Sequence, residues 1–430
     1  MIQNRILIVS GTPFRNDTNL GKTLCTLFSD YGADELTQLY FSPQTPNVPY
    51  CESYFQISEE QLLKSCFGIV KKRCGRIINK NQISGEGQSV ESHPKAILSL
   101  RNNTFVSLMR DYLWQISLIK TRKLKKWLQE VKPTVLFFVM PEDIKSSRII
   151  EYVVNECHCP TVMFITDDYY NDFKLNSGIL RRWYFIKRQK SLDHLCKNLK
   201  YVVGCSELAS KEFGKKYNVP FETLFTPSGS DYLKLPIHIA TNTPIVFRYF
   251  GNLGLERWKP LVELGHAITS YNSGEQKAIL EVYSNLRYPE AIAQLNIPNG
   301  CIVKGWVQGD EYVKLLQETD VAVHVESFSE EMCRRTRLSV STKIADYLGA
   351  GKCILCIGRE DLASVQHIQD VACVVNDPQT IDEKIGRLIE NVDYRQQLSV
   401  KAREKAMAQH SIKAIPQKLR KIINFVGGVH

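Results

Sequence analysis

Short apolar runs alternate with amphipathic helical patterns along almost the whole chain, and this alternation limits the fold more than any other feature. In the first half, runs typical of buried strands occupy residues 5–10, 134–139, 161–165 and 201–204. In the second half they occupy residues 245–250, 278–283, 301–303, 321–325, 353–357 and 371–375. Strands that alternate with helices predict parallel sheets covered on both faces. Two such series in 430 residues predict an α/β protein with two doubly wound domains.

A turn-rich stretch without periodicity separates the two series. Residues 226–231 read Thr-Pro-Ser-Gly-Ser-Asp, and residues 235–244 show little periodic pattern. We therefore expect one domain at residues 1–236 and the second at 237–410. Residues 411–430 carry apolar side chains at helical spacing, so we expect a final helix that packs back on the first domain.

The composition and charge bear on location and partners. No apolar run approaches the roughly 18–20 residues that cross a bilayer, and Arg5 interrupts the first strand pattern, unlike a signal peptide. We therefore expect a cytoplasmic protein. The net charge of +10 favours a polyanionic or membrane partner. Basic clusters that contain Trp127 and Trp183 suit an anionic membrane surface, with peripheral binding at its inner face. Solvated helix faces are the alternative, and no nucleic acid is expected because no recognised binding motif is present.

The chain contains thirteen cysteines, and their placement favours reduced thiols. Cys353 and Cys356 resemble a Cys-x-x-Cys pair, but they lie within one predicted strand. Residues three apart in a strand point to opposite faces, so this pair cannot easily share a metal or form a disulfide.

A glycine-rich turn follows the first predicted strand of the second series. Gly251-Asn252-Leu253-Gly254 separates residues 245–250 from a helical pattern. Such a turn places backbone N–H groups at the edge of the sheet where ligands bind. Arg257 and Lys259 lie at the start of the next helix, where cations are unfavourable for the helix itself. The pattern predicts a diphosphate site, and a plain turn with surface charges is the alternative.

A second candidate phosphate site lies at the start of a later helix. Ser341 and Thr342 are natural N-caps, and Gly351 suits the end of that helix. Exposed N–H groups together with Lys343 favour a bound phosphate. Asp346 lies about one turn further on the same side, where its carboxylate is placed to accept both hydroxyls of a ribose. An ordinary capped helix is the alternative.

Together these two elements resemble the donor site of GT-B glycosyltransferases, most closely family 4 of the retaining enzymes. Gly251-Asn252-Leu253 is similar to the family's Gly-Arg/Asn-Leu turn, and Arg257 takes the place of its phosphate-binding lysine. Gly305-Trp306-Val307 resembles the turn whose backbone meets the nucleobase. The block that begins at Ser341 is similar to the family's Ser-Lys…Glu-Tyr-Leu-Ala-x-Gly-Lys sequence, in which the acidic residue holds the ribose.

The resemblance implies the GT-B fold, with two doubly wound Rossmann-like domains facing a cleft. It implies transfer of a glycosyl group from a nucleotide-sugar to an acceptor hydroxyl with retention, without a bound metal or cofactor. Arg257 and Lys343 would act in catalysis by neutralising the leaving diphosphate. The implied donor-binding residues of this half are Gly251, Asn252, Lys259, Trp306, Val307, Ser341, Thr342 and Asp346. The acceptor would be a glycan or a lipid-linked glycan, in surface polysaccharide or other glycan biosynthesis.

Two positions depart from the family's pattern. The family often carries two glutamates here, one near the donor sugar and a second on the ribose. Asp346 takes the second position, and Leu338 takes the first, where its side chain cannot bond a sugar hydroxyl. Asn252 stands where the glycine turn often carries arginine. Candidates to compensate are Glu326, Glu330 and Glu331.

Two glycines of the first half are expected near the donor phosphates. Gly11 follows the first strand, and Gly21 opens the next helix. Gly21-Lys22-Thr23 resembles the end of a P-loop, but residue 16 is asparagine where that loop requires glycine. A nucleoside triphosphatase is therefore not favoured.

An acidic pair follows the strand at residues 161–165. At this end of a strand Asp168 is placed to act as a general base on the acceptor, with a structural N-cap as the alternative. Asp167-Asp168 lacks the Asp-x-Asp spacing of the metal site in GT-A enzymes, so no metal is expected.

Two functions of other classes remain open. A sugar-nucleotide epimerase shares this architecture but acts on the nucleotide-sugar alone. A non-catalytic two-domain binding protein for nucleotides or sugars would keep the cleft without paired phosphate sites.

Overall fold

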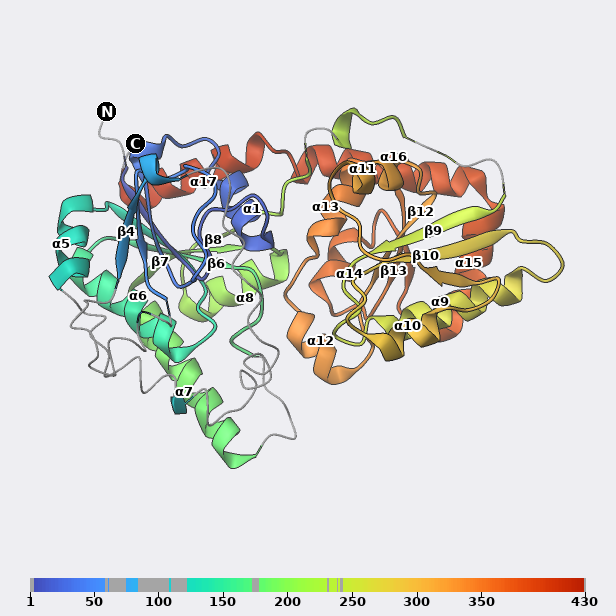
Figure 1. Ribbon diagram of the computed structural model, residues 1–430, viewed down its shortest axis with the longest axis horizontal. Helices are drawn as coiled ribbons and strands as arrows, with labels where there is room; N and C mark the ends of the chain where they lie inside the picture. The colour runs from blue at the N-terminus through green and yellow to red at the C-terminus, as the bar shows by residue number, and fades with distance from the viewer. Residues whose placement is uncertain are drawn as a thin grey trace. The chain divides into compact units, whose positions relative to one another are not determined.

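The computed structural model describes residues 4–58, 61, 75–83, 108–109, 122–171, 178–229, 232–237, 239 and 243–428. The chain forms two compact units (Figure 1). The first consists of Met1–Cys205, Ser210–Leu224 and Pro416–His430. The second consists of Ser206–Ala209 and Phe225–Ile415.

Within the described residues, the first unit is built on an eight-stranded sheet with the order β4-β3-β2-β1-β5-β6-β7-β8. Its strands are β1 (Ile6–Ser10), β2 (Leu36–Tyr40), β3 (Ser53–Gln56), β4 (Arg76–Asn79), β5 (Val135–Val139), β6 (Thr161–Ile165), β7 (Leu199–Gly204) and β8 (Phe221–Thr223). Neighbours pair in parallel except β3 and β4. β2, β3, β4 and β8 were not predicted. In β2 and β3, buried Gln38 and Gln56 interrupt the apolar pattern. Both glutamines bond to loop backbone, which compensates for their burial.

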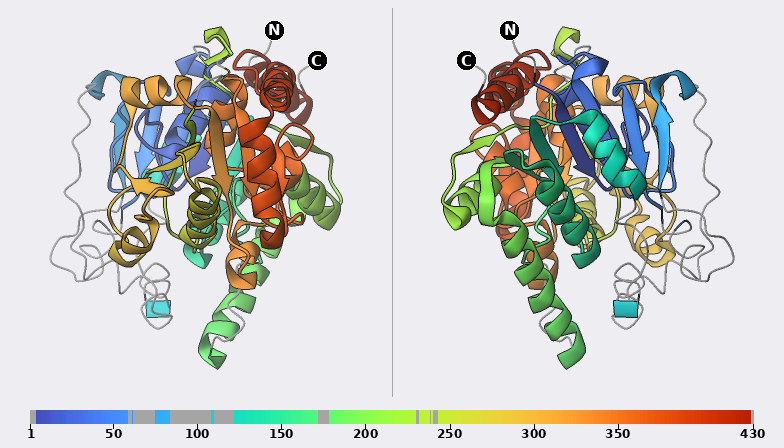
Figure 2. Two further views of the ribbon diagram at one scale, coloured as in Figure 1. Left: turned by 90° about the vertical axis from the view of Figure 1, so that its right-hand side faces the viewer. Right: turned by 90° about the vertical axis from the view of Figure 1, so that its left-hand side faces the viewer.

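The helices of the first unit surround this sheet (Figure 2). They are α1 (Asn19–Leu27), α5 (Arg122–Val131), α6 (Ile144–Cys157), α7 (Ile179–Leu195), α8 (Glu207–Tyr217) and α17 (Ala414–Gly427). The last helix, α17, contacts the N-terminal part of this unit. Arg420 pairs with Glu35 at 3.0 Å, and Asn424 accepts a hydrogen bond from Asn4 at 3.1 Å.

The second unit contains a six-stranded parallel sheet with the order β11-β10-β9-β12-β13-β14. Its strands are β9 (Ile245–Phe250), β10 (Ala278–Tyr283), β11 (Cys301–Val303), β12 (Val321–Val325), β13 (Cys353–Ile357) and β14 (Cys373–Val375). All of them were predicted, and β14 alone begins later than expected. The prediction was accurate here because these strands consist mostly of buried apolar residues.

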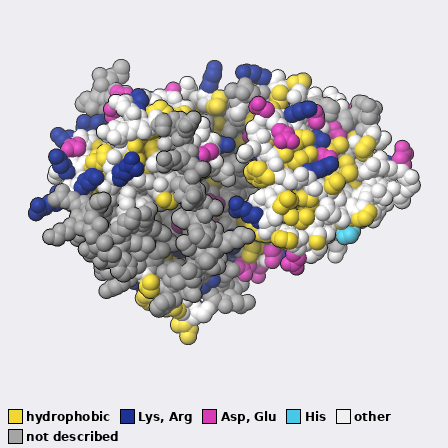
Figure 3. Space-filling model, viewed as in Figure 1, with side chains coloured by type: hydrophobic (Ala, Val, Ile, Leu, Met, Phe, Trp, Pro, Cys, Tyr) yellow, Lys and Arg dark blue, Asp and Glu magenta, His cyan; other side chains and the backbone are white. Residues whose placement is uncertain are grey.

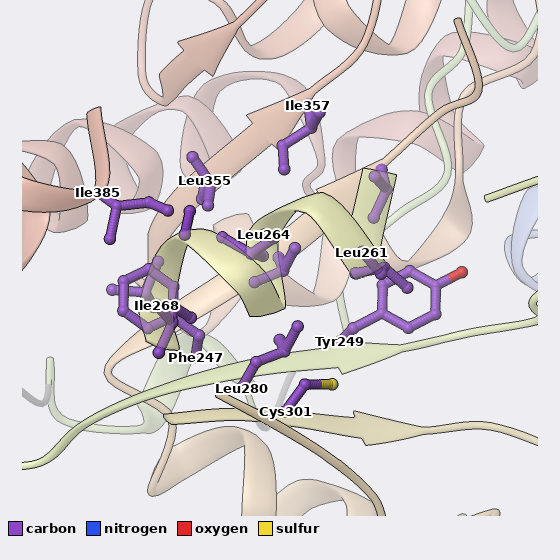
Figure 4. Close-up of a cluster of buried hydrophobic side chains, with 14 of the residues drawn as sticks. Phe247, Tyr249, Leu261, Leu264, Ile268, Leu280, Cys301, Leu355, Ile357 and Ile385 are labelled. Atoms are coloured by element: carbon purple, nitrogen blue, oxygen red, sulfur yellow. The ribbon is translucent and has the colours of Figure 1, made fainter. Parts of the chain in front are cut away.

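Alternate residues of these strands form two cores, one on each face of the sheet. On one face lie α9 (Trp258–Tyr271), α10 (Pro289–Leu295) and α15 (Ile381–Glu390). Figure 4 shows Leu261, Leu264 and Ile268 of α9 beside Phe247 and Leu280. On the other face lie α11 (Gly309–Gln317), α13 (Thr342–Gly349), α14 (Ala363–Ile368) and α16 (Val392–Gln409).

The two cysteines of β13 lie on opposite faces, as predicted. Cys353 belongs to the core on the side of α9, and Cys356 belongs to the core on the side of α13. The cysteines among the described residues are free thiols.

Residues 225–236, expected in the first domain, lie in the second unit. The ring of Phe225 stacks on His367 with centroids 4.1 Å apart. His410 Nδ1 donates to the carbonyl oxygen of Thr226 at 2.6 Å, and its Nε2 lies 2.9 Å from Nε2 of His367. Burial lowers the pKa of His367 to about 2 and that of His410 to about 4, so both rings are neutral at pH 7. A neutral pair lets His367 donate to His410, which ties the 225–228 segment to the end of α16.

None of the helices in the described part of the chain combines the length and apolar composition that a bilayer-spanning segment requires.

Candidate functional site

The strand order of the second unit reverses between β9 and β12. From β9 the chain runs outward through β10 and β11, and it then returns to β12 on the other side of β9. Open α/β sheets bind ligands outside the carboxyl ends of their strands at such a reversal. The glycine turn follows β9, and Glu326 follows β12. This edge of the sheet is therefore the candidate site of the second unit.

Hydrogen bonds to nearby residues hold the glycine turn in place. Tyr249 donates its hydroxyl to the carbonyl oxygen of Asn252 at 2.8 Å. The side chain of Asn252 accepts from the backbone N–H of Gly254 at 2.7 Å, and the N–H of Gly251 bonds to Tyr283 at 3.1 Å. A Cβ on Gly251 would lie 2.7 Å from the Tyr249 hydroxyl. Glycine is thus required for packing, and two of the N–H groups expected to face a phosphate already have partners.

Arg257, at the start of α9, forms a bidentate ion pair across the reversal. Its Nε and Nη2 donate to the carboxylate of Glu326 at 3.0–3.1 Å. The Glu326 side chain is 4% exposed and that of Arg257 is 22% exposed. Burial raises the pKa of Glu326, and the neighbouring guanidinium opposes that shift. Glu326, a candidate to contact the donor sugar, is instead bound to the arginine expected to face the diphosphate.

His324 of β12 is buried beside this pair. Its Nε2 is 3.7 Å from the Glu326 carboxylate and makes no hydrogen bond. Burial and the positive charge of Arg257 lower the pKa of His324 to about 3, so the ring is neutral. The one cation that neutralises Glu326 here is therefore Arg257.

A second cluster joins α13 to α11. Ser341 caps α13 by accepting from the backbone N–H of Lys343 at 3.4 Å. The Lys343 ammonium lies 3.7 Å from the centroid of the Tyr312 ring and 3.7 Å from the Asp346 carboxylate. The Tyr312 hydroxyl donates to the same carboxylate at 2.9 Å. Burial, followed by the negative charge of Asp346, raises the pKa of Tyr312. The tyrosine therefore remains a hydrogen-bond donor at neutral pH.

Tyr312 was missed from the sequence, since no motif marks it. It lies on α11 and meets Asp346 because α11 and α13 cover the same face of the sheet. Both helices precede a strand of a parallel sheet, so both begin at its carboxyl edge. The carboxylate of Asp346 and the cation of Lys343 are thus held on the edge where the strand order reverses.

The other predicted donor residues of this unit are more exposed. Trp306 is exposed in the loop after β11, and Val307 packs partly into the core; the preceding Gly305 has a φ of +99°. Lys259 is half exposed and pairs with Glu256 at 3.0 Å. Thr342 is the first residue of α13.

The position of the family's first glutamate is closed to a ligand. Leu338 is fully buried, and its carbonyl oxygen accepts from the Ser206 hydroxyl at 2.6 Å. The C-terminal end of α13 is also closely packed. A Cβ on Gly349 would lie 1.7 Å from Oγ of Ser228.

The candidate residues of the first unit occupy separate places. Gly11 is exposed directly after β1, where the strand order of that sheet reverses between β1 and β5. Gly21 lies in α1, and a Cβ there would approach Oγ1 of Thr18 to 2.5 Å. Close packing therefore accounts for Gly21 without a ligand.

Asp168 is buried and bonded to a neighbouring residue. The residue is 1% exposed, and its two carboxylate oxygens accept from the backbone and side-chain nitrogens of Asn171 at 2.9 and 3.1 Å. A general base must reach the proton that it removes. These bonds fit the structural cap that the sequence left open as the alternative, and the role of Asp168 as a general base stays a prediction.

Within the described ranges, no three histidine, cysteine, aspartate or glutamate side chains are arranged to hold a metal ion.

Comparison with known proteins gives a family match for part of the chain and supports the fold. Residues 250–421 match the family model described as glycosyl transferase-like. No curated protein matches the chain. Among solved structures, a glycosyltransferase from Rickettsia africae ESF-5 is 12% identical, with a TM-score of 0.57 over 98% of this chain and 99% of that one.

Two further structures agree with it. The lipopolysaccharide outer core galactosyltransferase WaaB is 13% identical, with a TM-score of 0.58 over 98% of this chain and 99% of that one. Anabaena HepE in complex with UDP-glucose is 12% identical, with a TM-score of 0.57 over 98% of this chain and all (100%) of that one. Identity this low shows the fold alone. The predicted GT-B fold is confirmed, and residues 250–421 of the chain match the glycosyl transferase-like family.

Proposed function

We propose that this enzyme transfers a glycosyl group from a nucleotide-sugar to an acceptor hydroxyl, with retention and without a bound metal or cofactor. The observation that carries the proposal is the cluster of Lys343, Tyr312 and Asp346 at the carboxyl edge of the second sheet. It lies within residues 250–421, which match the glycosyl transferase-like family. The UDP-glucose bound to the Anabaena protein of the same fold supports a nucleotide-sugar as the donor.

Lys343 would stabilise the leaving group. As the bond between the sugar and the diphosphate breaks, negative charge grows on the diphosphate, and a fixed cation lowers the energy of that state. The Tyr312 ring lies under the ammonium and keeps the flexible lysine stem in place. Asp346, oriented by the Tyr312 hydroxyl, would accept hydrogen bonds from the ribose.

Arg257 would contribute less charge than Lys343. Its bidentate pair with Glu326 is neutral as a unit, so a nearby diphosphate meets an oriented dipole and not a full positive charge. Lys259 is half exposed, and its charge is screened by solvent. Among the three cations, Lys343 is therefore expected to matter most for diphosphate affinity.

For the acceptor we propose a glycan or lipid-linked glycan, in the synthesis of a surface polysaccharide or another glycan at the inner face of a membrane. The support is the family resemblance and the shared fold of a lipopolysaccharide galactosyltransferase. The remaining donor contacts proposed are the loops at Gly11 and Gly251, the Trp306–Val307 turn and the N-terminus of α13.

The test compares nucleoside diphosphate binding by titration calorimetry. Lys343→Ala should weaken binding by about tenfold or more, which is roughly 1.4 kcal/mol. Lys314→Ala is the matched control, because Lys314 is an exposed lysine on α11, the helix that carries Tyr312. Wild-type affinity in Lys343→Ala would remove the main support for this donor site.

Asp346→Asn tests the ribose contact separately. The amide keeps the shape of the carboxylate but loses its charge. Relative to wild type, the variant should therefore bind a ribose nucleotide much more weakly, and the matching deoxyribose nucleotide only slightly more weakly. Asp382→Asn, on the exposed face of α15, is the control. Incubation with a panel of nucleotide-sugars, with and without membrane lipid extract, tests the reaction. Turnover to an epimer without acceptor, or no turnover at all, would contradict glycosyl transfer.

A further inference from the structure

The first half of α7 carries a stripe of exposed apolar side chains. Ile179 is 91% exposed, Trp183 is 50% exposed and Ile186 is 42% exposed. Their spacing of four and three residues places them on one side of the helix, over a length of about 11 Å. Leu180, 48% exposed, lies beside the stripe. Figure 3 shows hydrophobic side chains at the lower tip of the first unit, where Figure 1 places the start of α7. Large exposed apolar side chains in a group are typical of an interaction surface.

From Ile179 to Lys190 the charged side chains of the helix are all positive. Its cations are Arg181, Arg182, Lys187, Arg188 and Lys190, and no carboxylate precedes Asp193. Arg182 and Lys190 are exposed and lie within about one residue's rotation of the stripe. The Lys187 ammonium lies 4.8 Å from the Trp183 ring centroid. The stripe is therefore bordered by cations.

The second tryptophan of the basic clusters has a different setting. Trp127 of α5 is 2% exposed, and its indole N–H donates to the Ser53 hydroxyl at 2.8 Å. Its ring packs against Phe55. Trp127 belongs to the core of the first unit, so the expectation that it faces a membrane was wrong. Of the two tryptophans, Trp183 alone is presented to solvent.

We propose that residues 179–190 of α7 are a docking surface for an anionic lipid bilayer. The apolar stripe would enter the boundary between headgroups and acyl chains, and the bordering cations would contact lipid phosphates. Charge complementarity identifies the partner as anionic, and the aliphatic stripe favours lipid over nucleic acid, whose backbone does not bury such side chains. This surface goes beyond the proposed donor site and does not rest on it.

The test measures binding of the full chain to phosphatidylcholine vesicles with and without phosphatidylglycerol. Wild type should bind the anionic vesicles at low salt and be released at high salt, because exposed charges are screened. Trp183→Ala with Ile186→Ala should lower vesicle partitioning by on the order of tenfold or more. Arg182→Gln with Lys190→Gln should also lower it by on the order of tenfold.

Two controls separate this surface from general effects. Met407→Ala removes an apolar side chain that is 64% exposed on α16, and Lys401→Gln with Lys413→Gln removes two exposed cations outside the first unit. Both should bind vesicles as wild type does. The α7 variants and both controls should also bind nucleoside diphosphate as wild type does. Lys343→Ala, which tests the donor site, should bind vesicles as wild type does, so the two proposals can fail independently.

Each contrary outcome is decisive. Unchanged partitioning of the Trp183→Ala, Ile186→Ala variant would overturn the assignment to α7. Equal binding to vesicles without phosphatidylglycerol would overturn the assignment to anionic lipid. Binding to duplex DNA without binding to either vesicle would show that the partner is not a membrane.

Discussion

Two cationic regions of this protein, the carboxyl edge of the second sheet and the first part of α7, place similar residues in different surroundings. At the edge of the sheet, Arg257 pairs with Glu326 and Lys343 lies beside Asp346. In the first half of α7, no carboxylate accompanies the cations along the helix. A charge taken out of water requires a partner, whereas an exposed charge does not.

The aromatic residues of the two regions follow the same difference. Tyr312 is buried, and its ring and hydroxyl hold one cation and one carboxylate in fixed positions. Trp183 is half exposed, and its ring lies on a helix surface bordered by lysine and arginine. A buried, oriented cluster suits one small ligand, and an exposed cluster of like charges suits an extended anionic surface. The two regions have similar residue types. The extent of burial decides whether these residues suit a small ligand or an extended surface.

Removing Arg257, the cation of the buried pair with Glu326, should have the largest effect on stability. Arg257→Ala leaves the Glu326 carboxylate nearly buried without its counter-charge, which should lower the free energy of unfolding by about 3 kcal/mol. Lys259→Ala breaks a half-exposed pair on the same helix and should cost less than about 1 kcal/mol. Urea unfolding of both variants measures the difference.

The pH dependence of the Arg257→Ala variant provides a second readout. Burial already raises the pKa of Glu326, and loss of the guanidinium removes the effect that opposes this shift. The folded variant then holds a proton that the unfolded chain releases, so its stability falls as pH rises from the ordinary carboxyl pKa to the raised one. The variant should therefore be closest to wild type at about pH 4 and furthest at about pH 7. An equal deficit at both values would contradict the burial argument.

Replacing a glycine in each region tests how closely the two regions are packed, and the expected loss of stability is smaller than for Arg257→Ala. Gly349→Ala, at the end of α13, places a methyl group against Ser228 and should destabilise by roughly 1–3 kcal/mol. Gly178→Ala, at the start of α7, meets nothing within 4 Å and should cost about 0.5 kcal/mol or less. Thermal unfolding measures both, and a larger loss in Gly178→Ala would mean that the start of α7 is not open.

Chelation should have the smallest effect. If protein cations, chiefly Lys343, neutralise the leaving diphosphate, then transferase activity should be unchanged by EDTA. The measurement is turnover of the nucleotide-sugar before and after chelation. Loss of activity that manganese or magnesium restores would show that the cluster around Lys343 does not provide enough positive charge.

The sequence by itself determined most of the second unit. Its strands are mostly apolar and buried, with Arg248, Glu281 and His324 as the polar exceptions, so each can be recognised without a partner. The cap at Ser341 and the left-handed Gly351, with a φ of +59°, were also predicted, because capping depends on a few neighbouring residues. In the first unit, β2 and β3 escaped prediction because each contains a buried glutamine whose bonds go to distant loops.

Only the tertiary structure decided how the charged and aromatic side chains are used. Glu326 meets Arg257 because β12 lies beside β9, and Tyr312 meets Asp346 because two helices share one face of the sheet. Trp127 and Trp183 lie in similar basic sequences, yet a hydroxyl and a ring from β3 cover the first and no such strand covers the second. Local patterns predict helices and strands because those depend on neighbours in the chain. Burial and pairing depend on segments far apart in the chain, so they are settled only when the chain folds.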